Sequence, residues 1–359
     1  MRIVSIRAEA WTLPLAAPFV IAARTATEAR NVRVTVTTNT GVVGLGASAP
    51  VGYVTGESVE TVLTALAQAR PSLEGQSADD LEPLLRLAAA LLTDAPAARA
   101  GLEMAILDAW ARGQGRSLWA HFGGAFSRLT TDVTIPLVSP EEAARLAREA
   151  WADGFRALKL KVGDPDGPDA DLARLAAVAA ALPDVRLRVD ANQAFAPEAA
   201  VTFTRKLLAM GASVELLEQP VAKEDVDGLK FVRREVNPLG VPVFADEAAR
   251  SVAEVRQLIE RNVVDGMNVK LMKSGIGGAL EIIALCRAAG KKLMLGCMLE
   301  TGLGIAAAAQ IAAGTGAFDY LDLDSHRLLR PVPGLSGGFA VDGEELVTDD
   351  GPGWNVIFL

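Results

Sequence analysis

The sequence predicts an α/β fold: a (β/α)8-type TIM barrel, preceded by an N-terminal α+β domain that a C-terminal segment completes. Three observations predict it. The first 127 residues or so combine strand-like alternation with helical stretches. From Thr131 to about residue 325, short apolar runs alternate with Ala/Leu-rich helical segments, and there are eight such runs, the number that closes a parallel barrel. The 359 residues, half of them hydrophobic, suffice for a barrel with an added domain.

The N-terminal domain, residues 1–127, begins with two stretches that alternate as strands do, residues 2–11 and 31–43. Between them lies a connection of about nineteen residues, Thr12 to Arg30, far longer than an ordinary hairpin loop. We expect this connection to be a loop that covers the site and sets substrate specificity. Three helices are expected to follow, over residues 58–69, 79–92 and 97–112.

The barrel domain is expected over residues 128–326. Its apolar runs are nearly unbroken, as in strands that helices cover on both faces of a parallel sheet. The eight runs are residues 132–138, 157–162, 185–190, 213–218, 241–246, 266–270, 292–297 and 318–323. Residues 327–359 contain glycines and strand-like pieces, and we expect them to return to the first domain.

Composition excludes several classes of protein. The net charge of −9 argues against a nucleic-acid partner, and no apolar run approaches the length of a membrane span. The apolar stretch from Leu13 to Ala23 is interrupted by two prolines, so we do not expect a signal peptide. Cys286 and Cys297 show no C-x-x-C spacing, and no disulfide framework is expected. We therefore expect a cytoplasmic protein without membrane or nucleic-acid partners.

Acidic residues end three successive strands of the predicted barrel. Asp190, Glu218 and Asp246 are spaced 28 residues apart, which places them at one height in neighbouring units. A single acid at a strand end often caps the next helix. Three carboxylates converging without a cation would repel one another and raise each other's pKa. Because oxygen ligands suit a hard divalent ion, the pattern predicts a Mg²⁺ site at the carboxyl ends of the strands.

Lysines end the second and sixth strands. Lys159 and Lys161 lie two residues apart and share a face; alone, they would suggest a lysine-guarded edge strand. Lys270 ends the sixth strand, four strands away and hence on the opposite side of the mouth. Two bases on opposite faces of one carbon are what 1,1-proton transfer requires. Lys161 and Lys270 would exchange the α-proton of a carboxylate, while the cation and Lys159 stabilise the enediolate. Burial and neighbouring positive charge are expected to lower the lysine pKa values.

These residues stand in motifs that cover nearly the whole chain, in the order LKLKVG, RVDANQAF, ELLEQPV, FADEAA and NVKLMKSGIGGA. The set resembles the enolase superfamily, specifically its muconate-lactonizing subgroup. The resemblance implies a modified, enolase-like barrel with one Mg²⁺ per subunit on Asp190, Glu218 and Asp246. It also implies Lys161 and Lys270 as the bases. Asn192 would support the ligands.

Further residues resemble the dipeptide epimerases of that subgroup. Asp322 and Asp324, at the end of the eighth strand, share a face by strand parity and could hold a substrate ammonium group. The resemblance implies dipeptide contacts at Cys297 and Leu299, after the seventh strand, and at Thr134 on the first. Cys297 is expected to pack and not to act as a nucleophile.

Arg24 matches the arginine that binds the glutamate carboxylate in L-Ala-D/L-Glu epimerases, although a loop arginine is more often simply solvated. The resemblance thus implies a Mg²⁺-dependent isomerase, an epimerase of L-Ala-D/L-Glu from peptidoglycan turnover. Epimerases of hydrophobic or cationic dipeptides remain alternatives. Because barrels of this kind often associate, we expect a homo-oligomer.

Other reactions remain open within the subgroup, namely N-acylamino acid racemase, o-succinylbenzoate synthase and cycloisomerase. None of their substrates presents a free ammonium group, so none needs Asp322 and Asp324. A mandelate-racemase-like reaction uses a histidine base, but His121 and His326 lie away from the sixth and seventh strand ends. A non-catalytic barrel would have no reason to keep three ligands and two opposed bases.

Overall fold

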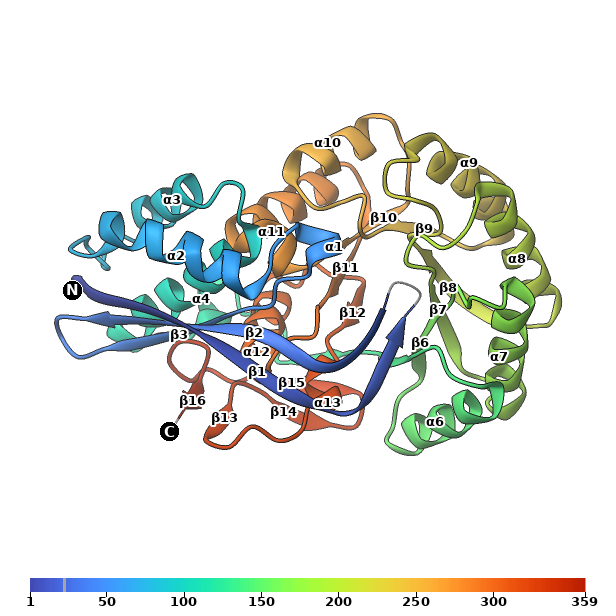
Figure 1. Ribbon diagram of the computed structural model, residues 1–359, viewed down its shortest axis with the longest axis horizontal. Helices are drawn as coiled ribbons and strands as arrows, with labels where there is room; N and C mark the ends of the chain where they lie inside the picture. The colour runs from blue at the N-terminus through green and yellow to red at the C-terminus, as the bar shows by residue number, and fades with distance from the viewer. Residues whose placement is uncertain (22–23, 359) are drawn as a thin grey trace.

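The computed structural model describes residues 1–21 and 24–358, which form an N-terminal domain and a barrel side by side (Figure 1). The N-terminal sheet is antiparallel, with the order β1-β2-β3. Its elements, with the helices that follow, are β1 (Ile3–Ile21), β2 (Arg24–Thr38), β3 (Val43–Ser48), α1 (Gly52–Thr55), α2 (Val59–Leu73), α3 (Leu81–Leu91), α4 (Pro96–Gly113) and α5 (Leu118–His121). The three helices expected in this domain are thus present as α2, α3 and α4.

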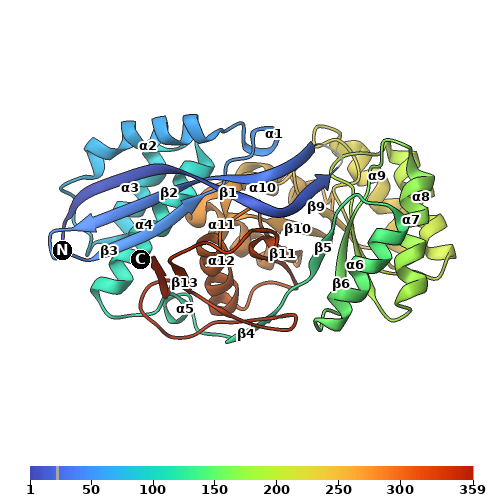
Figure 2. The same cartoon turned by 60° about the horizontal axis from the view of Figure 1, so that its bottom comes forward.

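Helix α4 lies between the N-terminal sheet and the barrel, and contacts β3 on one side and barrel helix α11 (Leu271–Ala288) on the other (Figure 2). Small residues allow this close approach. A Cβ atom added at Gly46 would lie 2.0 Å from the carbonyl oxygen of Gly101, and one at Gly44 would lie 2.2 Å from that of Ala105. The backbones of sheet and helix therefore pack directly on one another.

The prediction of a loop from Thr12 to Arg30 is wrong, because most of these residues continue the two strands. Pairing runs from Thr12 opposite Arg30 to Ile21 opposite Arg24, with an irregularity between Pro14 and Phe19. The prolines conceal the strand in the sequence, since proline lacks the N–H that a ladder uses. The result is a long hairpin that reaches the barrel mouth (Figure 1).

Backbone contacts fix this hairpin to the barrel and to the C-terminal segment. The N–H of Leu137 donates to the Val20 carbonyl at 3.0 Å, and the N–H of Arg330 donates to the Pro14 carbonyl at 3.1 Å. Leu15 forms an isolated antiparallel bridge with Leu329. The structure therefore covers the mouth with a paired strand.

The barrel is an eight-stranded parallel sheet with the order β12-β11-β10-β9-β8-β7-β6-β5. The strands are β5 (Val133–Ile135), β6 (Ala157–Lys161), β7 (Arg186–Asp190), β8 (Ser213–Glu218), β9 (Val243–Ala245), β10 (Gly266–Val269), β11 (Lys292–Gly296) and β12 (Tyr320–Asp322). A hydrogen bond of 3.2 Å from the Asp132 N–H to the Leu321 carbonyl links the two ends of the sheet. The predicted fold is confirmed: each expected run contains one strand.

The connecting helices surround the barrel (Figures 1 and 2). They are α6 (Pro140–Ala152), α7 (Pro168–Ala181), α8 (Pro197–Ala209), α9 (Val226–Val236), with a 3₁₀ turn at Asn237–Leu239, α10 (Val252–Glu260), α11, α12 (Gly302–Thr315) and the short α13 (Ser325–Leu328). Inside the barrel, Leu216, Phe244 and Met294 form a small buried cluster with Tyr320. These residues point inward two positions or so before the strand ends, so they form a floor beneath the site.

The C-terminal segment forms β13 (Leu335–Gly337), β14 (Ala340–Asp342), β15 (Glu345–Val347) and β16 (Val356–Phe358). β13 pairs with β16, while β14 and β15 form a sheet with β4 (Arg128–Thr130). Trp354 is fully buried against α4: its ring N–H donates to the Met104 carbonyl at 3.0 Å, and its backbone N–H donates to Asp108 at 2.8 Å. Among the helices described, we find none with both the length and the apolar character of a membrane span.

Candidate active site

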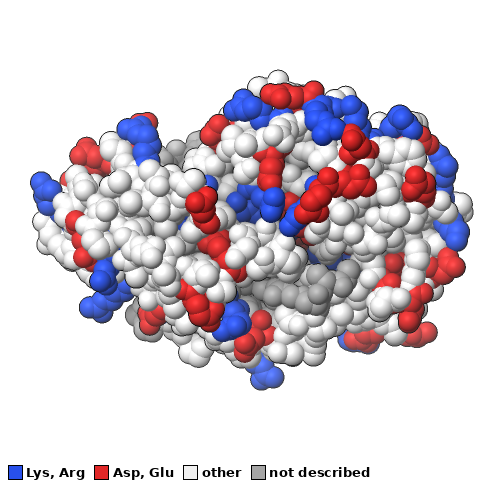
Figure 3. Space-filling model, turned by 45° about the horizontal axis from the view of Figure 1, so that its top comes forward, with Lys and Arg blue, Asp and Glu red and all other residues white. Residues whose placement is uncertain are grey.

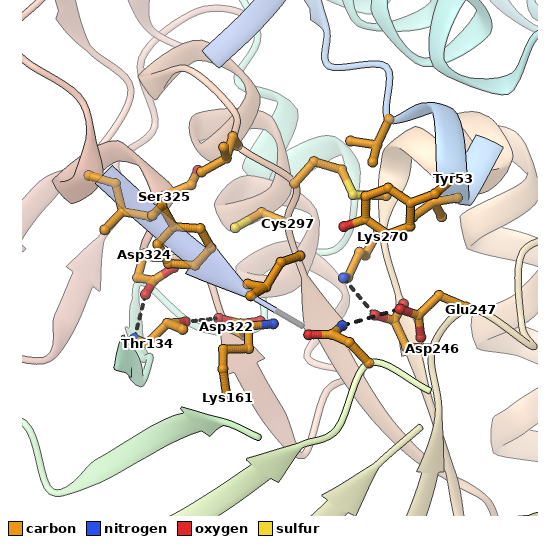
Figure 4. A pocket seen from close by; sticks show the side chains of 18 residues that line it. Tyr53, Thr134, Lys161, Asp246, Glu247, Lys270, Cys297, Asp322, Asp324 and Ser325 are labelled. Carbon is orange, nitrogen blue, oxygen red and sulfur yellow. Dashed lines mark hydrogen bonds and ion pairs between the residues drawn. The ribbon is translucent and has the colours of Figure 1, made fainter. Parts of the chain in front are cut away.

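A pocket lies at the barrel mouth, beneath the hairpin and α1 (Figure 4). The N-terminal domain contributes an apolar wall and one tyrosine, from Phe19, Ile21, Val51, Tyr53 and Val54. The barrel contributes charged and polar side chains, from Thr134, Lys161, Asn192, Asp246, Glu247, Lys270, Cys297, Asp322, Asp324 and Ser325, and the residues Met298, Leu299 and Leu328. The pocket therefore combines a polar floor with an apolar cover.

Asp190, Glu218 and Asp246 converge in the barrel mouth. Asp190 ends β7, Glu218 ends β8 and Asp246 follows β9, and all three side chains are buried. Each offers one ligand oxygen, and these oxygens lie within 4.8 Å of one another. Burial, together with the charge of Asp190, raises the pKa of Glu218 to about 7. An all-oxygen set of this geometry fits a hard divalent cation.

The ammonium groups of the three predicted lysines all contact these carboxylates. Lys159 is buried and lies 2.8 Å from Glu218, 3.0 Å from Asp190 and 2.8 Å from Asp322. The side chain of Lys161 lies 2.6 Å from Asp190. That of Lys270 lies 2.8 Å from Asp246. Lys161 and Lys270 approach the pocket from different sides in Figure 4. Lys159 is buried and is not among the residues that line the pocket.

The expected lowering of the lysine pKa values is not what the structure shows. Burial opposes the charged form, but the carboxylates outweigh it: Asp190 raises the pKa of Lys161, and Asp246 raises that of Lys270. The reverse effect is seen on Asp190, where burial raises the pKa but Lys159 and Lys161 lower it to about 2. The prediction of lowered lysine pKa values rested on burial and on the positive neighbours. The close contact of each lysine with a carboxylate is not evident from the sequence.

Two residues on strand β10 and helix α11 support the triad and were missed from the sequence. Lys273 donates to a carboxylate oxygen of Asp246 at 2.7 Å and to the Asn268 carbonyl at 2.6 Å. The side-chain amide of Asn268 donates to Glu218 at 2.6 Å. Strand parity could have found Asn268, because it shares a face with Lys270 two residues later. Lys273 could have been found one helical turn after Lys270.

Asn192 lines the pocket, as expected for a residue that supports the ligands. Its backbone N–H donates to Asp190 at 3.0 Å, and its side-chain amide donates to Glu247 at 3.2 Å. Its backbone has φ of +42°, a conformation that asparagine tolerates better than most residues. Glu247, which sequence reasoning did not single out, is buried beside Asp246, and burial raises its pKa to about 7.

Asp322 and Asp324 lie in the same pocket as Lys161 and Lys270 (Figure 4). Asp324 accepts a hydrogen bond of 2.6 Å from the backbone N–H of Thr134, whose hydroxyl lies 3.4 Å from Asp322. The structure thus brings together three predicted substrate contacts from the first and eighth strands.

Cys297 and Leu299 also line the pocket, after strand β11. Burial raises the pKa of the Cys297 thiol, which disfavours the nucleophilic thiolate. Asn31 of β2 donates to the Leu299 carbonyl at 2.9 Å, so the N-terminal domain contacts this segment directly. Arg24 begins β2, but its side chain lies outside the part of the chain that the structure describes.

Comparison with protein families gives the class. Residues 142–357 match the family model described as "Enolase C-terminal domain-like". Residues 1–123 match the model of the mandelate racemase / muconate lactonizing enzyme N-terminal domain. The chain belongs to this enolase-like family of mandelate racemases and muconate lactonizing enzymes.

Within this family, the chain is similar to several proteins named as dipeptide epimerases. The chain is 39% identical to a hydrophobic dipeptide epimerase of Citrifermentans bemidjiense, over 96% of this chain and 94% of that protein. The substrate-liganded structure of the L-Ala-D/L-Glu epimerase from Bacillus subtilis has a TM-score of 0.95 and 36% identity, covering 100% of both chains. The dipeptide epimerase from Enterococcus faecalis, complexed with Mg and L-Leu-L-Tyr, has a TM-score of 0.94 and 33% identity, covering 99% of this chain and 100% of that one.

Proposed function

We propose that this protein is a Mg²⁺-dependent dipeptide epimerase that inverts the α-carbon of the C-terminal residue, with L-Ala-D/L-Glu as its substrate. The observation that carries the proposal is the arrangement at the barrel mouth. Two lysines from strands four apart and a pair of aspartates line one pocket, and Asp246, which also lines it, belongs to a cluster of three carboxylates. The relatives that match over nearly the whole chain are named as epimerases of dipeptides.

Asp190, Glu218 and Asp246 would hold the Mg²⁺. When bound, the ion would supply positive charge that stabilises the negative charge developing on the oxygens of the substrate carboxylate. A cation held by Asp190 and Asp246 would offset their negative charge, so the two carboxylates would raise the pKa of Lys161 and Lys270 less. Asn192, Asn268 and Lys273 keep the carboxylates oriented.

One lysine removes a proton from the α-carbon, and the other donates a different proton to it. From one epimer Lys161 takes the α-proton, and Lys270 delivers a proton to the opposite face; for the other epimer the roles reverse. Asp322 and Asp324 hold the ammonium group of the N-terminal residue, and Thr134, Cys297 and Leu299 line the remainder of the dipeptide site. Lys159 holds Asp322 in place and adds positive charge beneath the enediolate.

The choice of glutamate as the epimerised residue depends on Arg24, whose guanidinium would pair with the side-chain carboxylate. The apolar cover formed by Phe19, Ile21, Val51 and Val54 supports instead a hydrophobic dipeptide as the second candidate. Turnover of L-Ala-L-Glu compared with L-Ala-L-Leu, in the native protein and in Arg24→Ala, separates the two.

The wider setting is also a proposal. Both cysteines are free, which supports a reducing cytoplasm, and L-Ala-D/L-Glu would come from peptidoglycan turnover. We propose that the protein forms a homo-oligomer, whose mass light scattering can measure. We also propose that the chain divides into an N-terminal domain (1–127), a barrel domain (128–326) and a C-terminal segment (327–359).

Replacement of either base tests the function. Lys161→Ala and Lys270→Ala should each abolish epimerisation, since each leaves one face of the α-carbon without a base. Each variant should retain α-proton exchange in D₂O with at most one epimer, followed by proton NMR from each pure epimer. Exchange of both epimers by either variant would falsify the two-base mechanism. Lys206→Ala, an exposed lysine on α8, is the matched control and should leave both rates unchanged.

A further inference from the structure

The segment from Lys270 to Gly277 joins the barrel to the N-terminal domain. Lys270 follows β10, and α11 begins at the next residue. Gly275 interrupts this helix with φ of +69°, so a first turn precedes the regular part of α11. This first turn contains Lys273, which holds Asp246 at 2.7 Å. Both lysines thus depend on the position of one short turn.

Helix α4 of the N-terminal domain holds the turn through two side chains. Glu103 accepts hydrogen bonds from the backbone N–H of Ile276 at 2.5 Å and of Gly277 at 3.2 Å. The guanidinium of Arg99, one helical turn earlier, donates to the Ser274 carbonyl. Glu103 therefore caps the regular part of α11 from another domain, and Arg99 holds the carbonyl just before the kink.

The fit around Gly275 is close. A Cβ atom at this position would lie 2.4 Å from Nε of Arg99 and 2.8 Å from a carboxylate oxygen of Glu103. Glu103 is buried, and burial raises its pKa to about 6, so the carboxylate is placed here against a solvation cost. A third contact comes from β3 and the chain after it, where the Ala49 N–H donates to the sulfur of Met272 at 3.2 Å.

The second base is held differently. Lys161 is the last residue of β6, which pairs along its length with β7, and its carbonyl accepts from Arg174 of α7 at 3.3 Å. These contacts all come from the barrel. Helix α4 therefore contacts the turn that follows Lys270. Among the contacts described, those that hold the backbone of Lys161 come from the barrel.

We propose that Arg99 and Glu103 are positioning residues for Lys270, so that a helix of the N-terminal domain sets the efficiency of proton transfer on one face of the substrate only. The inference rests on the proposed two-base epimerisation. It assigns to α4 a part in catalysis although neither side chain lines the pocket.

Face-selective exchange tests the proposal. The epimer whose α-proton exchange is lost in Lys270→Ala defines the Lys270 face. At saturating Mg²⁺, Glu103→Gln should slow exchange of that epimer of Ala-Glu by about tenfold or more, because an ångström of misplacement can cost on the order of 100-fold. Exchange of the other epimer should stay within about twofold. Equal slowing of both epimers, or of neither, overturns the proposal.

Asp108→Asn is the matched control on the same helix. Asp108 is also a buried carboxylate that accepts from two backbone N–H groups, those of Leu45 at 2.9 Å and Trp354 at 2.8 Å, and pairs with an arginine four residues away, Arg112. It does not touch the Lys270 turn in the described contacts. This variant should leave the ratio of the two exchange rates unchanged, and a shift like that of Glu103→Gln would mean that general loosening of α4 is the cause.

A second measurement does not depend on the activity. Amide hydrogen exchange, followed by mass spectrometry, should show lost protection over residues 270–277 in Glu103→Gln and not in Asp108→Asn. If Glu103→Gln fails to fold, Arg99→Lys, which keeps the charge but shortens the reach to Ser274, takes its place. If the native protein exchanges no dipeptide α-proton but Glu103→Gln loses protection over residues 270–277, the proposed function is refuted while the contact of α4 with this turn stands. Unchanged protection in Glu103→Gln refutes the role of α4 in holding the turn.

Discussion

Asp322 and Asp324 share a face of one strand end yet differ in their electrostatic state. For Asp322, burial is outweighed by Lys159 and Lys161, and the pKa is lowered. For Asp324, burial and the charge of Asp322 raise the pKa to about 6, and no described lysine lies in ion-pair contact with it. A substrate ammonium group beside Asp324 would supply the missing positive charge. Asp324 is therefore the more sensitive position for recognising a free amino terminus.

Asp324→Asn should raise KM for L-Ala-L-Glu by about 30-fold or more, on the order of 2 kcal/mol for a buried charged hydrogen bond. Turnover of N-acetylglutamate, which lacks the ammonium group, should not improve. Steady-state kinetics with both substrates measure this. Asp319→Asn is the control, because Asp319 lies before the same strand and accepts from the Leu293 N–H at 2.9 Å, away from the pocket. Unchanged dipeptide KM in Asp324→Asn would favour a substrate without a free amine.

The triad and the lysines could be predicted from the sequence because each lies at or near the end of a strand, and strand ends of a parallel barrel meet at one edge. Asp190, Glu218 and Asp246 needed only their even spacing. Glu103 could not be predicted, since it acts from a different domain, 173 residues before the Ile276 amide that it accepts from. A contact of that kind depends on how two domains pack, which a local pattern does not record.

At the scale of elements, the barrel strands were predictable and the hairpin was not. Buried parallel strands are continuous apolar runs between helices, so their pattern survives in the sequence. The outer half of the hairpin contains Pro14 and Pro18, and its alternation is lost there. It persists as a strand because it is bonded to Leu137 of the barrel and to Leu329 and Arg330 of the C-terminal segment.

The hairpin should influence the substrate through Asn31. Asn31→Ala removes the hydrogen bond to the Leu299 carbonyl, so the segment that lines the pocket is held less firmly against β2. We expect KM for dipeptides to rise by about three- to tenfold with a smaller change in kcat, since a net hydrogen bond contributes about 0.5–1.5 kcal/mol. Asn39→Ala is the control, because Asn39 accepts from the Arg2 N–H at the far end of the same sheet and should leave KM unchanged. A loss confined to kcat would contradict this role.

At the scale of the whole molecule, one face can be compared with the interior. On the face drawn in Figure 3, acidic and basic side chains lie interspersed. The contacts that join the parts of the molecule lie in its interior. There α4 is enclosed by the N-terminal sheet, by α11 and by the chain around Trp354. The two domains and the C-terminal segment thus share one helix.

Trp354→Ala should destabilise the protein by about 3–5 kcal/mol, the usual loss for a large buried aromatic residue. The ring is fully buried and stacks on Phe122 at 6.2 Å between centroids. Equilibrium unfolding in urea measures the change. Trp151→Ala, on the outer helix α6 and only partly buried, is the control and should cost less. Equal losses in the two variants would show that the C-terminal segment adds little to α4.

The bond between Trp354 and Met104 spans 250 residues of chain. During translation, the ribosome must therefore release every barrel strand before the earliest domain can complete its interior. Contacts so distant along the chain slow folding, and residues that follow the barrel are the ones that complete the packing of the first domain.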